Sequence, residues 1–456
     1  MRKKSVHLVG IGGIGVSGIA KLLLEAGWEV SGSDVQSSAI TTDLERDGVR
    51  VFIGHKASHV EGADLVIFSS SIAPSNPELI AARNRKIPTW PRGRALAASV
   101  AKKRTIAVAG SHGKTTTTAF VSSVLLAGKQ DPTILIGAEV PRFGGNARVG
   151  KGRWAVVETD ESDGSFLYMH PSVAVITNID QEHLDFYRNL DETYRAYAQF
   201  AKQLKPKGAL LGCVDDPGVR ALIKRLKAPW LTYGCRPSAQ LRATRIQSGQ
   251  GHSRYTLVVK GKSLGPIELP VAGHHNVLNS LAAVGCGLFL GISFSKIQSG
   301  LAEVPQIARR FESRGMIQKV QVIEDYAHHP AEIDATLKAA RSWEPGRLLC
   351  VFQPHRFSRT QHLKERFGSC FSQADQLILT DVYAASEDPG AGTGVDALYR
   401  AVRKNGFKPV QKLRKDKIVS QLTRTTRAGD MVLVLGAGDI GDIAGELVTA
   451  LERKQN

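Results

Sequence analysis

A glycine-rich segment near residue 110 has the residue types of a phosphate-binding loop. Its sequence is Gly110-Ser111-His112-Gly113-Lys114-Thr115-Thr116. In such a loop Lys114 would neutralise the β- and γ-phosphates of a nucleoside triphosphate, and the Thr115 hydroxyl would bind Mg²⁺. The first glycine of the usual spacing is missing, because Val108 stands six residues before the lysine. We still predict a triphosphate site, since an apolar run precedes the loop and a helical pattern follows it.

Two acidic segments could complete a magnesium site beside this loop. The first begins at Glu158 and ends at Asp163, and the second runs from Thr177 to Asp185 and contains His183. Each follows an apolar run that indicates a buried strand, so a parallel sheet would bring both segments to the edge that carries Lys114. Carboxylate oxygens suit Mg²⁺. His183 is a less typical ligand, and taken alone it is more typical of a surface or core histidine.

A second glycine loop, Gly10-Ile11-Gly12-Gly13-Ile14-Gly15, follows a strand pattern and opens a helical pattern. Gly12, Gly13 and Gly15 would let the backbone approach a diphosphate at the helix N-terminus. Asp34 follows 19 residues after Gly15, where an acid often meets a ribose. Three interpretations remain open: a nicotinamide dinucleotide site, a UDP-sugar site, or a turn needed only for packing. The similar run 436–441 is more typical of a turn bordering an active cleft.

The elements that must position these loops alternate between strand and helix patterns along the whole chain. This rhythm predicts an α/β fold with mostly parallel sheets. Between residues 239 and 270 alternating residues rich in turn formers predict a small β element at the edge of a domain. Helices are predicted at Gly15–Ala26 and Asn276–Leu290. The predicted strands are Ser5–Val9, Glu29–Ser31, Leu65–Ser69, Thr105–Ala109, Trp154–Glu158, Val173–Thr177, Val320–Glu324, Leu348–Phe352, Gln376–Thr380 and Met431–Leu435.

Length and composition limit the class of protein. A chain of 456 residues is long enough for about three domains, which we place at 1–103, 104–313 and 314–456. Its five cysteines form no CxxC pair, which favours free thiols in a reducing compartment over a zinc site. No apolar stretch is long enough to span a membrane. We therefore expect a cytoplasmic protein without a membrane partner.

The net charge of +18 could attract nucleic acid, anionic lipid or a polyphosphate substrate. The basic residues are spread along the chain, without a long Lys/Arg block or an aromatic-basic signature of RNA binding. We therefore favour small polyphosphate substrates over nucleic acid as partners. A non-catalytic nucleic-acid binder stays as a distant alternative.

Together the motifs resemble the Mur ligase family over essentially the whole chain. The run Gly110–Thr116 is similar to the compact P-loop of that family, and six further residues occupy positions of its invariant set: Glu158, His183, Asn276, Asn279, Arg310 and Asp325. The resemblance implies an N-terminal Rossmann-like domain that binds a UDP substrate, a central ATPase domain and a C-terminal Rossmann-like domain. It implies ATP as substrate and two Mg²⁺ ions.

The resemblance also assigns roles to residues. Lys114, Glu158, His183 and Arg310 would be catalytic, with Thr115 and Glu158 holding one Mg²⁺ and His183 a second. His275, Asn276, Asn279, Arg310 and Asp325 would join the 110–116 loop in binding ATP. The UDP substrate would contact Gly12, Gly13, Gly15, Asp34, His355, Arg356 and Arg359, and Tyr326 and His328 would line an amino-acid pocket. Taken alone, the His328-His329 pair is more typical of a structural role.

Several runs resemble the family branch that adds L-alanine, among them 158–166, 273–279, 325–330, 352–360 and 381–387. That branch joins L-alanine to the lactyl carboxylate of UDP-N-acetylmuramate through an acyl phosphate. Two departures from the common family pattern occur: Glu182 stands where Asp is commoner, and Ala198 lies where some members carry a carbamylated lysine. The second departure agrees with the alanine-adding branch, so we predict no carbamylation.

Two enzymatic alternatives stay open. A sister ligase that adds a preformed tripeptide to the same UDP-sugar would share every phosphate-binding motif. An NAD-dependent oxidoreductase would use Gly10–Gly15 but would leave Lys114 and the acidic segments without a role. The sequence is compatible with a monomer or a homodimer.

Overall fold

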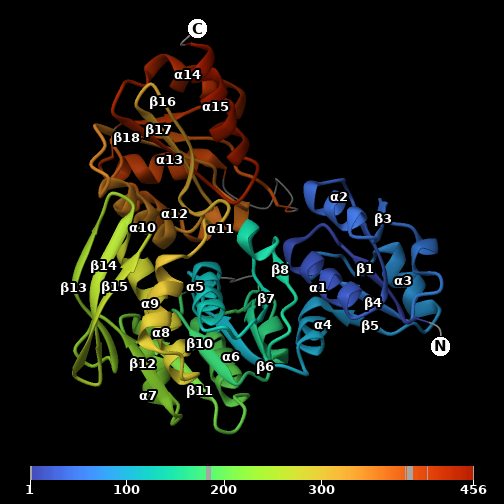
Figure 1. The fold of residues 1–456 in the computed structure, drawn as a ribbon. Helices are drawn as coiled ribbons and strands as arrows, with labels where there is room; N and C mark the ends of the chain where they lie inside the picture. Colours follow the sequence, from blue (N-terminus) through green and yellow to red (C-terminus); the bar gives the residue numbers. More distant parts are fainter. Residues whose placement is uncertain (1–2, 181–185, 386, 388–393, 408, 455–456) are drawn as a thin grey trace. The chain divides into compact units, whose positions relative to one another are not determined.

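The structure is a computed structural model that describes residues 3–180, 186–385, 387, 394–407 and 409–454 (Figure 1). The chain divides into two compact units. Unit 1 consists of Met1–Ile246, Tyr255–Leu269 and Asn276–Pro305, and unit 2 consists of Gln247–Arg254, Pro270–His275 and Gln306–Asn456.

The first sheet of unit 1 is parallel throughout and has the strand order β3-β2-β1-β4-β5. This order reverses between β1 and β4, and ligands of open α/β sheets bind at the carboxyl ends of the strands at such a point. The loop at Gly10–Gly13 follows β1 and therefore lies at this position. The strands are β1 (Ser5–Val9), β2 (Glu29–Asp34), β3 (Arg50–Ile53), β4 (Leu65–Phe68) and β5 (Thr89–Pro91).

Four α-helices accompany these strands, three of them between strands of the sheet and the fourth after β5. The first is close to the predicted helix and begins directly after the glycine loop. The helices are α1 (Ile14–Glu25), α2 (Ala39–Arg46), α3 (Pro77–Asn84) and α4 (Arg92–Ser99), and a 3-10 turn, η1, spans Ala57–Val60.

The second sheet has ten strands in the order β15-β14-β13-β12-β11-β10-β6-β9-β7-β8. The strands from β12 to β7 are parallel, and β8 runs antiparallel to its neighbour, β7. Because β6 lies between β9 and β10, the segments that follow these two strands flank the loop that follows β6. The predicted shared edge is thus confirmed for the described residues.

The strands of this sheet include the predicted β element, which forms its β13–β15 edge. Their bounds are β6 (Arg104–Ala109), β7 (Thr133–Leu135), β8 (Ala147–Arg148), β9 (Trp154–Glu158), β10 (Val173–Ile176), β11 (Ala209–Cys213), β12 (Trp230–Gly234), β13 (Leu241–Gly249), β14 (His252–Val259) and β15 (Lys262–Leu269). The accompanying helices are α5 (Lys114–Ala127), α6 (Leu190–Lys202), α7 (Pro217–Arg225), α8 (His274–Phe289) and α9 (Phe294–Ala302), with 3-10 turns η2 (Pro141–Phe143) and η3 (Ser165–Tyr168).

Unit 2 contains a six-stranded sheet in the order β16-β17-β21-β18-β19-β20, in which β16 and β17 pair antiparallel and the other neighbours pair parallel. The strands are β16 (Glu312–Ile317), β17 (Val320–Asp325), β18 (Arg347–Phe352), β19 (Gln376–Leu379), β20 (Val410–Lys412) and β21 (Asp430–Leu435). The helices are α10 (Pro330–Arg341), α11 (Phe357–His362), α12 (Lys364–Ser369), α13 (Val395–Lys404), α14 (Lys415–Thr425) and α15 (Gly441–Arg453).

Both faces of this sheet are buried, which explains why its strands are continuous apolar runs. Along β18, Leu348, Cys350 and Phe352 belong to one core cluster, and Leu349 and Val351 belong to another. Helix α10 contributes to the first cluster and α15 to the second, so helices cover the sheet on either side.

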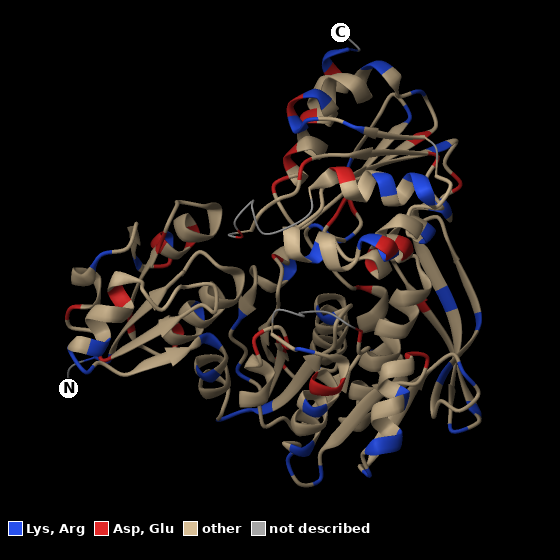
Figure 2. Ribbon diagram, turned by 180° about the vertical axis from the view of Figure 1, so that it is seen from behind, with Lys and Arg blue, Asp and Glu red and all other residues tan. Residues whose placement is uncertain are grey.

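The cysteines, the charge distribution and the lengths of the helices can be compared with the predictions from the sequence. All five cysteines are free, as expected. Lys and Arg are distributed over many helices and loops and are interspersed with Asp and Glu (Figure 2). In the part of the chain that the structure describes, every helix is too short or too polar to cross a membrane.

Candidate active site

The loop between β6 and α5 has the backbone geometry of an anion-binding turn. Gly110 and Gly113 have φ angles of +138° and +77°, which side chains other than glycine rarely adopt. Gly113 is the N-cap of α5 and makes no side-chain capping bond, so the first N–H groups of the helix face the loop. A Cβ at Gly113 would lie 2.6 Å from Asn279 Oδ1. The site therefore needs glycine both for conformation and for space.

Lys114 begins α5 and folds back over this loop. Its Nζ donates to the carbonyl oxygen of Gly110 at 2.7 Å and to Glu161 Oε1 at 2.9 Å. Burial by itself would lower the pKa of Lys114, but the carboxylates of Glu161 and Asp160 outweigh it and raise the pKa. The ammonium therefore keeps its positive charge at neutral pH. Glu161, only 2% exposed, was not among the predicted site residues.

Thr115 and Glu158 form the predicted pair of oxygen ligands. Thr115 Oγ1 donates to Glu158 Oε1 at 2.9 Å, and the N–H of Gly137 donates to Glu158 Oε2 at 2.7 Å. A Cβ at Gly137 would lie 2.7 Å from Glu158 Oε1. A hydroxyl and a carboxylate held side by side next to a lysine are suitable ligands for Mg²⁺ bound to a triphosphate.

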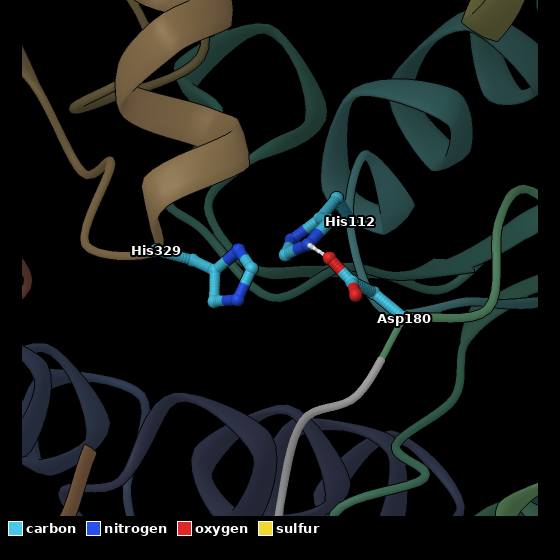
Figure 3. Close-up of side chains that lie close together, drawn as sticks. All are labelled: His112, Asp180 and His329. Carbon is cyan, nitrogen blue, oxygen red and sulfur yellow. Dashed lines mark ion pairs between the residues drawn. The ribbon is translucent and has the colours of Figure 1, made fainter. Parts of the chain in front are cut away.

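The segment after β10 holds the other side of the loop. Asn178 Oδ1 accepts from the His112 N–H at 2.7 Å, and Asn178 Nδ2 donates to the His112 carbonyl oxygen at 2.9 Å. The N–H of Asp180 donates to Ser111 Oγ at 2.9 Å. His112 and Asp180 point toward one another, with 3.6 Å between Nε2 and Oδ2 (Figure 3). Asn178 and Asp180 lie in the predicted acidic segment, and the structure shows that they position the loop, a role that the sequence did not assign to them.

The second predicted metal ligand, His183, lies outside the described residues, as does the whole 181–185 run. Its role as a ligand stays a prediction.

Asn276 and Asn279 occupy the first turns of α8, on the other side of the loop. Asn279 Oδ1 accepts from Thr117 Oγ1 at 3.2 Å, and its Nδ2 donates to Asn276 Oδ1 at 3.4 Å. Asn279 is 7% exposed and lies against Gly113. Unit 1 therefore brings together five of the predicted residues: Gly113, Lys114, Thr115, Glu158 and Asn279.

The glycine loop at 10–15 is bound to the end of β2. The N–H groups of Gly10 and Ile11 donate to the Ser33 carbonyl oxygen, and the N–H of Gly12 donates to Asp34 Oδ2 at 2.9 Å. A Cβ at Gly12 would also lie 2.9 Å from that oxygen. Asp34 thus supports the loop, while its predicted contact with a ribose stays a prediction. Gly13 is the N-cap residue of α1 and has no side chain to cap the helix. The first N–H groups of α1 are therefore left for an anion.

A buried carboxylate lies directly behind this loop. Glu78 is fully buried and accepts from Ser33 Oγ at 2.6 Å; His59 Nδ1 lies 2.7 Å and His55 Nδ1 lies 3.0 Å from its oxygens. Burial alone would raise the pKa of Glu78, but His7, whose Nε2 lies 3.6 Å from Glu78 Oε1, and the hydrogen bonds with Ser33 and His59 lower it to about 2. No sequence pattern indicated this cluster, because its members come from four separate segments of the chain.

Unit 2 brings Arg310, Asp325 and Tyr326 close together. Asp325 Oδ2 accepts from the Phe311 N–H at 2.7 Å and Oδ1 from the Ala327 N–H at 2.8 Å. Burial raises the pKa of Asp325, against the charge of Arg310. The Arg310 guanidinium lies 5.3 Å from the centre of the Tyr326 ring.

Arg309 is a residue of unit 2 that the sequence patterns did not identify. Its Nε donates to Glu324 Oε1 at 2.7 Å, and its Nη2 donates to the carbonyl oxygens of Gly436 and Gly438. Arg309 therefore holds the glycine turn at 436–441 against β17.

The predicted substrate residues of unit 2 form one cluster. The rings of His328 and His355 are 5.7 Å apart, and Arg359 Nη1 lies 3.3 Å from His355 Nδ1. Burial lowers the pKa of His328 to about 3 although Glu332 opposes it, and burial with Arg359 lowers the pKa of His355 to about 4. Both imidazoles are uncharged at neutral pH. Arg356 holds a φ of +69°, a strained conformation that is often found at functional sites.

His275 also belongs to unit 2. Burial, with the charges of His274 and Arg310, lowers its pKa to about 4, so this imidazole is neutral as well. Its predicted contact with ATP stays a prediction.

Comparison with known families and proteins agrees with this geometry. Three family models match: "Mur ligase family, catalytic domain" at residues 5–104, "Mur ligase middle domain" at 108–287, and "Mur ligase, glutamate ligase domain" at 309–438. Together they span most of the chain and all three sheets.

Individual relatives are similar over the full length. UDP-N-acetylmuramate–L-alanine ligase from Syntrophus aciditrophicus is 43% identical over 459 residues, which covers 100% of this chain and 96% of the relative. The ligase of the same name from Desulfotalea psychrophila is 44% identical over 449 residues, 98% of each protein.

A solved structure supports the fold assignment. The crystal structure of UDP-N-acetylmuramate–alanine ligase from Thermotoga maritima matches with a TM-score of 0.83 and 28% identity, covering 99% of both chains. The predicted α/β fold of three domains is thereby confirmed. With family models over most of its length and full-length relatives above 40% identity, this chain belongs to the Mur ligase family.

Proposed function

We propose that this chain is an ATP-dependent ligase that joins L-alanine to the lactyl carboxylate of UDP-N-acetylmuramate, a step of peptidoglycan precursor synthesis. The structural observation that carries the proposal is the juxtaposition of Lys114 with the Thr115–Glu158 pair at the loop that follows β6, the strand between β9 and β10. The named relatives support the choice of substrates.

The reaction makes an amide from a carboxylate, which is a poor acyl donor because oxide is a poor leaving group. A carboxylate oxygen attacks the γ-phosphorus of ATP, which gives an acyl phosphate and releases ADP. The uncharged amine of L-alanine then attacks the carbonyl carbon. The tetrahedral intermediate expels inorganic phosphate, and the amine loses a proton to form the amide.

The protein residues contribute positioning and charge rather than covalent chemistry. Lys114 places a permanent ammonium at the β- and γ-phosphates, and the N–H groups of the 110–116 loop and of the α5 N-terminus bind phosphate oxygens. Thr115 and Glu158 would hold a Mg²⁺ ion, which supplies charge neutralisation for the transferring phosphoryl group. We propose His183 as a ligand of a second ion.

The remaining assignments rest on the family resemblance. We propose His275, Asn276, Asn279, Arg310 and Asp325 as nucleotide contacts, and Gly12, Gly13, Gly15, Asp34, His355, Arg356 and Arg359 as contacts of the UDP-sugar. Tyr326 and His328 would face the amino acid, where an uncharged His328 avoids repelling an ammonium group. We place the domain boundaries at 1–103, 104–313 and 314–456, and infer a cytoplasmic location because ATP and UDP-sugars are made there.

The test is ADP release by the purified protein with UDP-N-acetylmuramate, offering one amine substrate at a time. We expect release that requires L-alanine and produces UDP-N-acetylmuramoyl-L-alanine. Turnover with a tripeptide but not with L-alanine would favour the tripeptide-adding branch. Reduction of NAD by the protein, without ADP release, would favour an oxidoreductase.

A further inference from the structure

Arg92, the first residue of α4, binds the acidic segment 158–163. This segment lies beside the proposed ATP-binding loop at 110–116. Its Nη2 donates to Asp160 Oδ2 at 2.9 Å and to Asp163 Oδ2 at 3.3 Å. The side chain is only 16% exposed, and the two aspartates stand 68 and 71 residues further along the chain. An arginine that bridges two carboxylates at this burial fixes the segment more firmly than a surface ion pair does.

The same guanidinium also faces the glycine loop at 10–15. A Cβ at Gly15 would lie 2.8 Å from Arg92 Nη1, so a larger residue at position 15 would displace the arginine. Gly15 lies in the first turn of α1, whose N-terminus is the proposed diphosphate site. The glycine, predicted only as a diphosphate contact, therefore also makes room for Arg92.

The start of α4 is tightly packed against the acidic segment. A Cβ at Gly93 would lie 2.6 Å from the Cβ of Ser165, the first residue of η3. The segment itself is braced, because the N–H of Ser162 donates to Asp160 Oδ1 and that of Ser165 to Asp163 Oδ1. A shift of the segment would therefore be transmitted to Arg92.

The acidic segment 158–163 also contacts the loop at 110–116. Glu161, next to Asp160, accepts from Lys114 Nζ at 2.9 Å. Triphosphate oxygens would compete with Glu161 for the Lys114 ammonium, so ATP binding would change the balance of charge in the segment. Arg92 is paired with two of its carboxylates and touches the loop for the UDP-sugar.

We propose that Arg92 is a positioning residue that couples binding of ATP to binding of the UDP-sugar. The proposal rests on the proposed function, since it requires both ligands to bind the loops named above. Arg92 acts through the 158–163 segment on one side and through the first turn of α1 on the other.

The experiment measures the affinity of the full-length protein for UDP-N-acetylmuramate by calorimetry, with and without a non-hydrolysable ATP analogue and Mg²⁺. In the wild-type protein we expect the analogue to change this affinity by about tenfold, a typical allosteric coupling. The coupling factor is the ratio of the affinities measured with and without the analogue. In Arg92→Gln this coupling factor should fall to nearly one, and Arg92→Lys should restore part of it.

Arg94→Gln is the matched control, because Arg94 lies on the same helix, is exposed, and stacks on Trp90. It should keep the wild-type coupling factor. Thermal melting separates coupling from folding: a structural role alone would lower the melting temperature and leave the factor unchanged. A wild-type factor in both Arg92 variants, or no coupling in the wild type, would overturn the proposal. Absence of wild-type binding to either ligand would instead contradict the proposed function.

Discussion

The hydroxyl of Thr115 donates a hydrogen bond of 2.9 Å to Glu158, and this contact joins the start of α5 to the end of β9. The second carboxylate oxygen of Glu158 accepts from the Gly137 N–H. Glu158 is therefore held in one orientation before any ligand binds, and such preorganisation is how enzymes stabilise charge at low cost.

Replacing Glu158 by Gln keeps its size and removes its charge. We expect Glu158→Gln to lower kcat by about 10³-fold, because the weaker ligand no longer balances the charge of a metal ion at the phosphates. ADP release measured against Mg²⁺ concentration should show a higher requirement for the ion. Glu303→Gln, at an exposed carboxylate of the same unit, should stay within about twofold of the wild type. Equal activity of both variants would refute the assignment.

The Lys114–Glu161 pair separates stability from catalysis. Lys114→Met should destabilise the protein by about 3–5 kcal/mol, because it removes one partner of a buried ion pair. The double variant Lys114→Met/Glu161→Gln should recover much of that stability in urea unfolding while ADP release stays undetectable. If the double variant regained activity along with stability, Lys114 would have only a structural role.

Gly113 combines a positive φ with close contact to Asn279. Gly113→Ala should cost about 1–3 kcal/mol from the backbone alone and should also raise the KM for ATP, because the new methyl group would push Asn279 away from the loop. Gly144→Ala is a suitable control, since Gly144 has a φ of +80° and open space around it. It should lose similar stability, and its KM for ATP should not change. A raised KM in both variants would show that the contact with Asn279 is irrelevant.

The loop at 110–116 and the strands that surround it were predictable, because their signals are local: an apolar run, a glycine turn and a helical pattern in sequence. The shared edge of β6, β9 and β10 followed from the rule for parallel sheets. The ion pairs of Arg92 and Glu161 were not predictable, although Glu161 lies in the predicted acidic segment, since ion pairs between residues far apart along the chain leave no periodicity in the sequence. Short strands such as β3 and β5 were missed for a related reason, because three or four residues carry too little pattern.

In unit 2 the sequence located four of the six strands, β17, β18, β19 and β21, but not β16, β20 or the interactions at the strand ends. Arg309 stands beside the predicted Arg310, and composition offers no reason why Arg309 rather than Arg310 should bind the glycine turn. The distinction depends on which side chain reaches Gly436 after the chain has crossed the sheet.

Glu78 predicts a specific loss of stability in acid. Its pKa in the folded protein, about 2, is below the ordinary value of 4.5, so its contribution is present above pH 4.5 and is lost as the pH falls toward 2. The contribution is at most about 3 kcal/mol. In urea titrations, Glu78→Gln should be less stable than the wild type at pH 6, and the difference should shrink between pH 4.5 and 2. A difference that is independent of pH would show that Glu78 acts through shape alone.

The most direct test follows oxygen atoms through the reaction. UDP-N-acetylmuramate labelled with ¹⁸O in the lactyl carboxylate is incubated with ATP, Mg²⁺, L-alanine and the enzyme, and the released phosphate is analysed by mass spectrometry. If the carboxylate attacks the γ-phosphorus, each phosphate released should carry one labelled oxygen, with the other retained in the amide carbonyl. Phosphate free of label, formed together with the amide, would contradict carboxylate phosphorylation and with it the proposed roles of Lys114 and Glu158.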